Sequence, residues 1–139
     1  MKQCSAALGI STFGPGLYDF TRRVSEVVAQ SGVKEGLVTC FIRHTSASLV
    51  IQENADRDVL ADLEAFMRRL VSRELGLYRH TTEGPDDMPS HIRSALTQTS
   101  ISVPVNAGAL ALGTWQAIYV FEHRDAGHRR DVLVHIVGD

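Results

Sequence analysis

The feature that most constrains the fold is a pair of segments near the C-terminus, residues 116–122 and 132–137, which are apolar on both faces and rich in β-formers. A strand with one face in water alternates apolar and polar residues, and these two do not. In a chain of 139 residues, two such strands imply a sandwich interior or a face covered by another subunit. This length suits one domain with a real core, so we expect a single domain over residues 1–139.

Shorter strands are predicted from β-forming residues bounded by turn signals, at residues 3–10, 37–44, 48–52, 100–105 and 110–112. Alternation over residues 37–44 places His44 on the same face as Val38, Cys40 and Ile42, so His44 continues an apolar, inward face. We expect residues 48–52 to form a strand paired with this one.

Helical spacing of apolar residues predicts three helices. The first begins near Leu17, after the Pro15-Gly16 turn, and ends before Gly32. The second covers residues 55–73 with Asn54 as its cap, and Asp56 and Asp58 are then helix-start residues favoured by the macrodipole. The third is short, at residues 88–97.

The composition argues against several partners. A net charge of -2 and a pI near 6.3 give no general attraction to nucleic acid or to an anionic membrane. Two cysteines, Cys4 and Cys40, are too few for a disulfide scaffold, and no apolar run reaches the roughly 20 residues of a membrane-spanning helix. The N-terminus lacks the long apolar segment of a signal peptide, so we expect a soluble, cytoplasmic protein.

The segment from His80 to His91 has neither helical nor strand periodicity, and it contains two histidines and three carboxylates. Neutral imidazoles and carboxylates are what a divalent metal or a proton-transfer site requires, although a polar loop would read similarly. Asp87 and His91, four residues apart, would lie on one face of a helical turn and suit one metal ion. Alternatively, Asp87 caps the helix and His91 is merely exposed.

Three further clusters of polar residues can each be interpreted either as part of a binding site or as an ordinary structural feature. The hydroxyls that follow His44 in residues 44–48 could hold phosphate oxygens or form a hairpin turn. Trp115, in residues 112–116, could wall a site or belong to the core. Arg124 with Arg129 and Arg130 could grip phosphate or form a solvated hairpin tip.

Taken in order, several blocks of this sequence resemble the YjbQ-like family, often labelled secondary thiamine-phosphate synthase, and the likeness spans nearly the whole chain. The blocks are His44–Leu49, Glu53–Asn54, Glu83–Ile92, Leu112–Gln116, Glu122–Arg124 and Arg129–Arg130. The resemblance implies an α+β fold: an antiparallel β-sandwich core with two to three packed helices, assembled as a homotrimer. It also implies histidine-lined metal sites near subunit boundaries.

The activity that the resemblance implies joins a pyrimidine diphosphate to a thiazole phosphate, with loss of pyrophosphate. Such chemistry normally uses a divalent ion on the diphosphate, whereas several histidines on one ion favour zinc and hydrolysis. We therefore keep either zinc or magnesium as the metal cofactor. Two alternatives also remain: a module that binds metal and a phosphorylated small molecule without turnover, and a zinc-dependent hydrolase.

The working hypothesis assigns three roles. The predicted metal ligands are His44, His80, His91 and Asp87. The predicted proton-transfer groups are Glu53 and Asp86. The predicted contacts to a phosphorylated substrate are Thr45, Ser46, Ser48, Asn54, Thr114, Trp115, Gln116, Arg124, Arg129 and Arg130. Of the other histidines, His135 is expected in the core or an interface, His128 at a loop tip, and His123 is left undecided.

Overall fold

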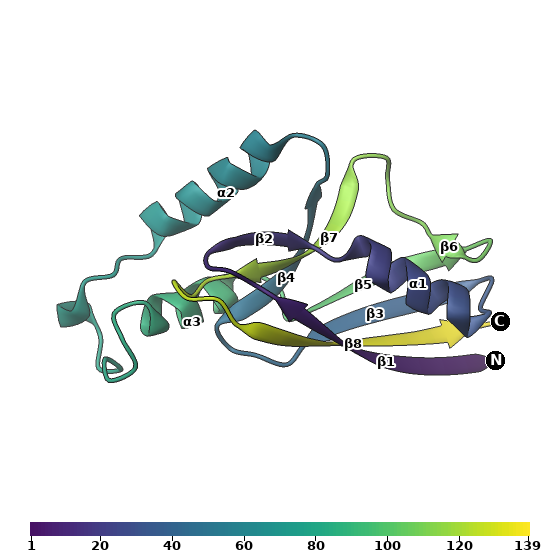
Figure 1. Ribbon diagram of the computed structural model, residues 1–139, viewed down its shortest axis with the longest axis horizontal. Helices are drawn as coiled ribbons and strands as arrows, with labels where there is room; N and C mark the ends of the chain where they lie inside the picture. Colours follow the sequence, from purple (N-terminus) through teal and green to yellow (C-terminus); the bar gives the residue numbers. More distant parts are fainter.

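The computed structural model describes residues 1–139 and contains two antiparallel sheets (Figure 1). The larger sheet has, in spatial order, β1 (Lys2–Ser11), β8 (Arg129–Gly138), β3 (Gly36–Ile42), β5 (Ser100–Asn106) and β6 (Ala109–Leu110). The smaller sheet has the order β2 (Gly16–Asp19), β7 (Gln116–Glu122) and β4 (Ala47–Glu53).

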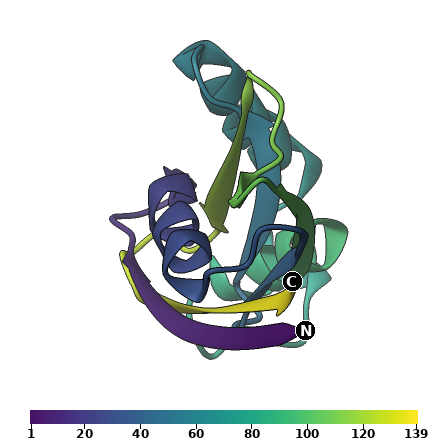
Figure 2. The ribbon, with the colours of Figure 1, turned by 90° about the vertical axis from the view of Figure 1, so that its right-hand side faces the viewer.

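Three α-helices and one short 3-10 helix complete the fold: α1 (Thr21–Ser31), α2 (Arg57–Leu70), η1 (Leu75–Leu77) and α3 (Asp87–Leu96). Figure 2 shows the larger sheet curling beneath α1. The expected α+β class with an antiparallel sandwich and two to three helices is confirmed, in a strongly curled form. None of the helices combines the length and apolar character needed to span a membrane.

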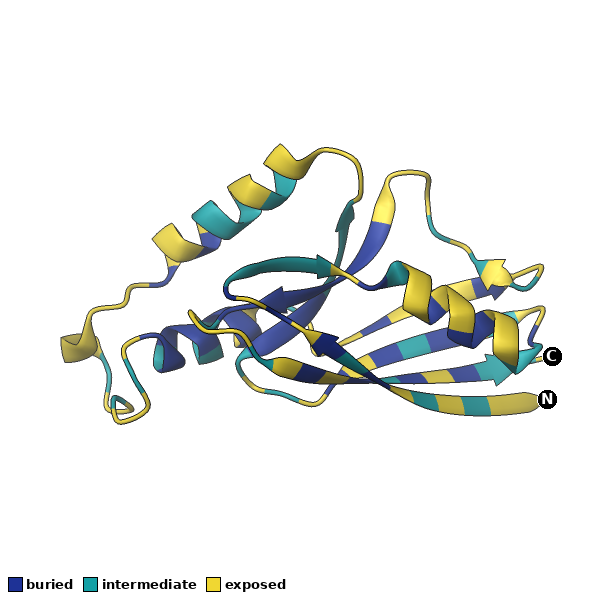
Figure 3. Ribbon diagram, viewed as in Figure 1, coloured by how far each residue is buried: buried dark blue, intermediate teal, exposed yellow.

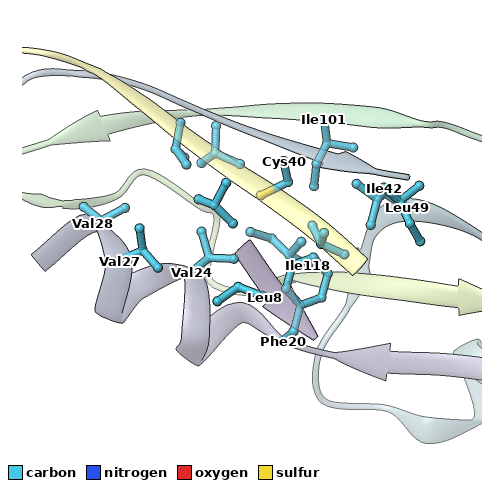
Figure 4. Packing of buried hydrophobic residues seen from close by; sticks show 14 of the residues in the cluster. Leu8, Phe20, Val24, Val27, Val28, Cys40, Ile42, Leu49, Ile101 and Ile118 are labelled. Carbon is cyan, nitrogen blue, oxygen red and sulfur yellow. The ribbon is translucent and has the colours of Figure 1, made fainter. Parts of the chain in front are cut away.

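The core lies between the inner faces of the two sheets and α1 (Figure 4). Alternate residues of β3, namely Val38, Cys40 and Ile42, point into it, and α1 contributes Val24 and Val28. This pattern follows from the two periods in the sequence, two for the strands and 3.6 for the helix. Burial also raises the pKa of the Cys40 thiol to about 12, so this cysteine stays protonated within the core.

The two C-terminal segments differ in how they use their apolar faces. Every residue of β7 after Gln116 is buried, as expected for a strand inside a sandwich. On β8, by contrast, burial alternates along the strand (Figure 3). The inward residues such as Val134 and Ile136 are buried, and His135 on the outer side is exposed. His135 therefore lies outside the core, where its Nδ1 is 2.6 Å from the hydroxyl of Ser5.

The first predicted helix begins too early. Leu17 to Asp19 belong to β2, which pairs with β7, and α1 starts only at Thr21. The pairing of β2 with β7 is a tertiary interaction that outweighs the helical spacing of Leu17 and Phe20. At the other end the prediction holds, because Gly32 ends the helix with a φ of 73°, a conformation that glycine adopts without strain.

Two other details differ from the sequence-based predictions. The strand at residues 48–52 pairs with β7 in the smaller sheet, not with β3, because the chain crosses between sheets after Ile42. Helix α2 begins at Arg57, and its cap is Asp56, whose side chain accepts a hydrogen bond from the Asp58 backbone N–H. The Asn54 side chain instead donates to the carbonyl oxygen of Thr114.

Helix α2 stands away from the body of the molecule (Figure 1). Its predicted apolar stripe is present in the sequence, but Met67 is the only residue of the helix that is buried. Phe66 and Leu70 each expose about half of their surface. The carbonyls at its C-terminal end are held by the buried guanidinium of Arg93, which donates to Met67 and Val71.

Candidate metal centre

Three of the predicted metal ligands come together beside the first turns of α3. One ligand atom from each of His80, Asp87 and His91 lies within 4.8 Å of the other two. Asp87 Oδ2 is 2.6 Å from His80 Nε2 and 3.0 Å from His91 Nε2. Asp87 and His91 meet because a separation of four residues brings side chains onto one helix face, and the preceding loop carries His80 to them.

The hydrogen bonds of His91 determine which of its ring nitrogens can bind an ion. Its Nδ1 lies 2.9 Å from the carbonyl oxygen of Thr45, which can only accept, so Nδ1 carries the proton. In the neutral ring, Nε2 then presents a lone pair to the Asp87 carboxylate. Two acceptors at this distance repel each other unless a cation, either a second proton or a metal ion, lies with them. The donor set therefore fits a divalent metal.

Arg124 ties the two aspartates of this region together. Its Nη1 is 2.8 Å from Asp87 Oδ1, and its Nε is 2.8 Å from Asp86 Oδ2. The hydrogen bond from Arg124, helped by one from the Asp125 backbone N–H, lowers the pKa of Asp86 to about 2. A carboxyl with this pKa carries no proton near neutral pH, which suits an orienting role better than proton transfer.

Burial opposes the ionisation of Asp87, but its neighbours outweigh this effect. The hydrogen bond from His80 and the charges of His91 and Arg124 bring the pKa of Asp87 below its ordinary value. Asp87 is the first residue of α3, and its carboxylate binds these side chains and does not cap the helix. The residue at the cap position, Asp86, makes no side-chain cap hydrogen bond either.

A fully buried carboxylate, Glu122, contacts the centre indirectly, through the backbone of Arg124. It accepts hydrogen bonds from the Thr12 hydroxyl at 2.6 Å, from Arg130 Nε at 2.8 Å, and from the backbone N–H of Arg124 at 3.3 Å. Burial would raise the pKa of Glu122, yet the hydrogen bonds of Arg130 and Thr12 lower it overall. Glu122 therefore stays ionised and holds the backbone from which Arg124 reaches the two aspartates.

His44, the fourth predicted ligand, lies outside the group of three. Its Nε2 accepts a hydrogen bond from the Asp131 backbone N–H at 2.7 Å, and its Nδ1 is 3.3 Å from Arg130 Nη1. Burial and the positive charge of Arg130 lower the pKa of His44, so the ring is neutral at pH 7. With Nε2 committed to the backbone, His44 would have to rotate before it could bind a metal ion.

His123, left undecided from the sequence, is buried beside the centre. Its Nε2 is 2.9 Å from the Ser48 hydroxyl, while its Nδ1 has no hydrogen-bond partner. Burial lowers the pKa of His123 to about 3, so the ring is neutral at pH 7. Ser48 is buried as well, and its hydroxyl also accepts from Thr97 at 2.6 Å. Ser48 is thus a packing residue of the interior.

The three arginines of the predicted phosphate grip do not converge. Arg124 is neutralised by Asp86 and Asp87, and Arg130 is buried against Glu122 while donating to the Ser46 hydroxyl at 3.1 Å. Arg129 is exposed and lies over Gly9 of β1. Ser46 thus serves Arg130, and Thr45 orients His91 through its carbonyl.

The remaining predicted site residues gather at the other end of the β4–β7 pair. Glu53 pairs with Gln116 there, whereas Ala47 pairs with Glu122 at the end near the centre. Strands of seven residues at about 3.4 Å per residue separate the two ends by about 20 Å. The residues at this far end are Glu53, Asn54, Thr114, Trp115 and Gln116. Trp115 is 65% exposed and does not line the centre.

Sequence reasoning missed two parts of this arrangement. It assigned Arg124 and Arg130 to substrate, whereas both neutralise carboxylates of the protein itself. It also placed Glu122 only in the Glu122–Arg124 block of the family resemblance and did not predict that this carboxylate is buried. The one available signal was the position of Glu122 at the end of an otherwise apolar strand, where a charge must find a partner.

The fold and the centre together define a small α+β protein with a candidate metal site of two imidazoles and one carboxylate. The chain belongs to the YjbQ-like family, since the family model described as UPF0047 protein YjbQ-like matches residues 7–139.

Known relatives agree with this assignment. The chain is 54% identical over 138 residues to the UPF0047 protein sll1880 of Synechocystis, covering 99% of this chain and 94% of that protein. It is 44% identical over 107 residues to the UPF0047 protein YjbQ of Escherichia coli, covering 77% of each. Its fold matches that of a YbjQ-like protein of unknown function from Sulfolobus solfataricus with a TM-score of 0.86, at 24% identity and over 99% of both chains.

Proposed function

We propose that this chain is a metal-dependent enzyme whose divalent ion is held by Nε2 of His80, Nε2 of His91 and the carboxylate of Asp87. The observation that carries the proposal is the His91 ring, whose Nδ1 is committed to the Thr45 carbonyl while its Nε2 faces a carboxylate. Two imidazoles and one carboxylate are a donor set typical of catalytic zinc, with positions left open, whereas magnesium prefers oxygen ligands. Zinc is therefore the favoured ion.

The metal would polarise a substrate oxygen or lower the pKa of a bound water. The surrounding residues supply orientation. The Thr45 carbonyl selects the tautomer of His91, and Arg124 fixes the unshared oxygen of Asp87. Asp86, ionised at neutral pH, holds Arg124 in place for that task.

The reaction that the family resemblance implies, thiamine-phosphate synthesis from a pyrimidine diphosphate and a thiazole phosphate, is the first to assay. Zinc-dependent hydrolysis of a phosphorylated small molecule is the second candidate, because Arg124 and Arg130 are neutralised by carboxylates and offer little net charge to a departing diphosphate. We expect activity in one of two assays of zinc-loaded protein: release of pyrophosphate from the two synthase substrates, or release of phosphate from p-nitrophenyl phosphate.

The metal site is tested by elemental analysis of untagged protein purified without chelators. We expect one zinc per chain, and at least about a hundredfold loss of zinc affinity in Asp87→Asn and His91→Ala, since both remove a ligand. His44→Ala and Glu53→Gln are matched controls and should keep the metal. Unchanged zinc content in His91→Ala would contradict the proposed centre.

Turnover is tested separately from binding. Glu53→Gln and Asp86→Asn retain every metal ligand, so loss of rate with unchanged zinc content would assign them to proton transfer or positioning. If unmodified protein loaded with zinc or magnesium shows no rate above background in either assay, the result favours the alternative of a binding module without turnover.

We also propose a homotrimer, as the family resemblance implies. An apolar surface that lacks cover in one chain supports it, namely the side of α2 that carries Phe66 and Leu70. In such an assembly the far-end residues, about 20 Å from the centre of their own chain, could approach the centre of a neighbouring chain. Light scattering should give three times the chain mass of 15.3 kDa, and a monomeric mass would refute this assembly.

A further inference from the structure

A groove of about 450 Å³ lies between α3 and the end of β3. Its lining includes Phe41, Arg43 and Thr45 from the end of β3 and the loop after it, and His91, Ala95 and Thr99 from α3 and the segment that follows it. Small-molecule sites commonly have volumes of about 300–1,000 Å³, so the groove is large enough for a single ring with a substituent.

The groove adjoins the candidate metal centre through His91, which belongs to both. Asp87, His91 and Ala95 are spaced four residues apart, so they follow one face of α3 from the centre to the groove. Two helical turns at about 1.5 Å per residue make this path about 12 Å long. A ligand seated in the groove would therefore extend toward the metal.

Arg43 distinguishes this groove electrostatically. Its side chain makes no hydrogen bond or ion pair with the protein, unlike Arg124 and Arg130, which are each paired with carboxylates. The hydroxyls of Thr45 and Thr99 also lack protein partners, and both residues are exposed. An unpaired guanidinium beside free hydroxyls is suited to a phosphate group.

Phe41 gives the same groove an apolar surface. Phe41 is 46% exposed although it lies on a strand of the larger sheet, and the exposed Ala95 lines the same groove. An exposed aromatic ring within reach of a free guanidinium suits a ligand that is planar and apolar at one end and anionic at the other.

We propose that this groove binds a planar ring that carries a phosphate group, with the phosphate on Arg43 and the ring beside Phe41. As a substrate site, the groove rests on the proposed function, because the metal centre would act on what the groove presents. It replaces the phosphate grip of Arg124, Arg129 and Arg130 that the sequence had indicated.

The probe is phenyl phosphate, titrated into the full chain and followed by amide NMR shifts, with zinc-loaded and chelator-treated protein in parallel. We expect saturable shifts centred on residues 41–45, 95 and 99, and weaker binding of phenol, which lacks the anion. Benzoate tests whether the anion must be a phosphate. Arg43→Gln should weaken phenyl phosphate at least about tenfold, as for loss of a charge-assisted hydrogen bond.

Arg57→Gln is the matched control, because Arg57 is also an exposed arginine but lies on α2, outside the groove. It should bind phenyl phosphate as the unmodified chain does. Ala95→Trp, on the exposed face of α3, should block binding by filling the groove, and its amide spectrum shows whether the chain is folded.

Shifts elsewhere in the chain, or equal affinity in Arg43→Gln, would overturn the proposal. So would a groove occupied by a second copy of the chain, in which case Phe41→Glu lowers the oligomeric mass and phenyl phosphate causes no shifts. The two proposals can fail separately: binding in the groove of a chain that takes up no zinc refutes the metal centre alone, and zinc uptake without phenyl phosphate binding refutes the groove alone.

Discussion

The two ends of the β4–β7 strand pair carry similar residue types, yet they are built in different ways. At one end, Glu122 and Ser48 are buried, and their partners are separated from them by as many as 110 positions in the sequence. At the other end, Glu53 accepts from the backbone N–H groups of Asn54 and Ala55, directly after it. The first end is held by hydrogen bonds to buried groups. The second is held by hydrogen bonds of exposed or half-exposed groups, both local ones at Glu53 and distant ones such as that from Asn54 to Thr114.

This difference indicates where a preorganised site can form. Buried hydrogen bonds to a charge fix side chains tightly, because leaving such a group unsatisfied is costly. Exposed hydrogen bonds compete with water and leave their side chains adaptable. The end with Glu122 is therefore suited to hold a metal centre, and the far end is better suited to a turn or a contact with another chain.

The largest difference in stability between the two ends should appear when Glu122→Ala is compared with Glu53→Ala. Glu122→Ala leaves the Arg130 guanidinium buried without its carboxylate, a change that typically costs about 3–5 kcal/mol of unfolding free energy. Glu53→Ala, at the far end, should cost less than about 1 kcal/mol. Urea denaturation followed by circular dichroism measures both. If Glu122→Ala is too unstable to study, the amide variants can be compared instead. Glu122→Gln should then be less stable than Glu53→Gln.

Asp86→Asn should lower the unfolding free energy by an amount that depends on pH, because Asp86 belongs to the ion pairs beside the metal centre. The folded pKa of Asp86, about 2, is below its unfolded value, so its ionised form stabilises the protein above that unfolded value. At about 1.4 kcal/mol per pKa unit, the unmodified chain should exceed the variant by about 2 kcal/mol at pH 7. The gap should stay constant down to about pH 5 and close between about pH 4 and pH 2.

Urea titrations of chelator-treated protein at several pH values would measure this gap. Arg124→Gln is a useful companion, because it removes the partner of Asp86 and should raise the carboxyl pKa toward its ordinary range. A gap that is independent of pH would show that Asp86 and Arg124 do not form this ion pair in solution.

The smallest difference is expected between Ser48→Ala and Asn54→Ala. Ser48 is buried and its loss leaves His123 and Thr97 without a shared partner, so we expect a cost of about 1–2 kcal/mol. Asn54 is exposed, and water can replace its hydrogen bonds, so its removal should change stability by no more than about 0.5 kcal/mol. Thermal melts of the two variants, made in parallel, would measure the difference. Equal costs would contradict the contrast between the ends.

Those parts of the fold that depend on short-range patterns could be predicted. The strands β3 and β7 and the helices α2 and α3 lie close to their expected ranges, because period-2 and period-3.6 patterns span only a few residues. The start of α1 was wrong, since Leu17 belongs to β2, whose partner Phe121 lies 104 positions away in the chain. Local spacing contains no information about such a partner.

The candidate site likewise contains some contacts that local spacing predicts and others that it does not. The proximity of Asp87 and His91 follows from one helical turn, and so it could be read directly from their spacing. The contacts of His44 with Arg130 and Asp131, and of Arg124 with Asp86, join residues 38 to 87 positions apart. No pattern within one segment specifies these pairs.

The sequence by itself determined the alternating strands and the pairing of Asp87 with His91, because both depend on residues close together in the chain. It also determined the membership of the YjbQ-like family, which depends on short sequence motifs. Only the tertiary structure decided which polar clusters meet. The antiparallel register of β4 and β7 puts Ala47 beside Glu122 at one end and Glu53 beside Gln116 at the other, so residues that looked like one site are about 20 Å apart.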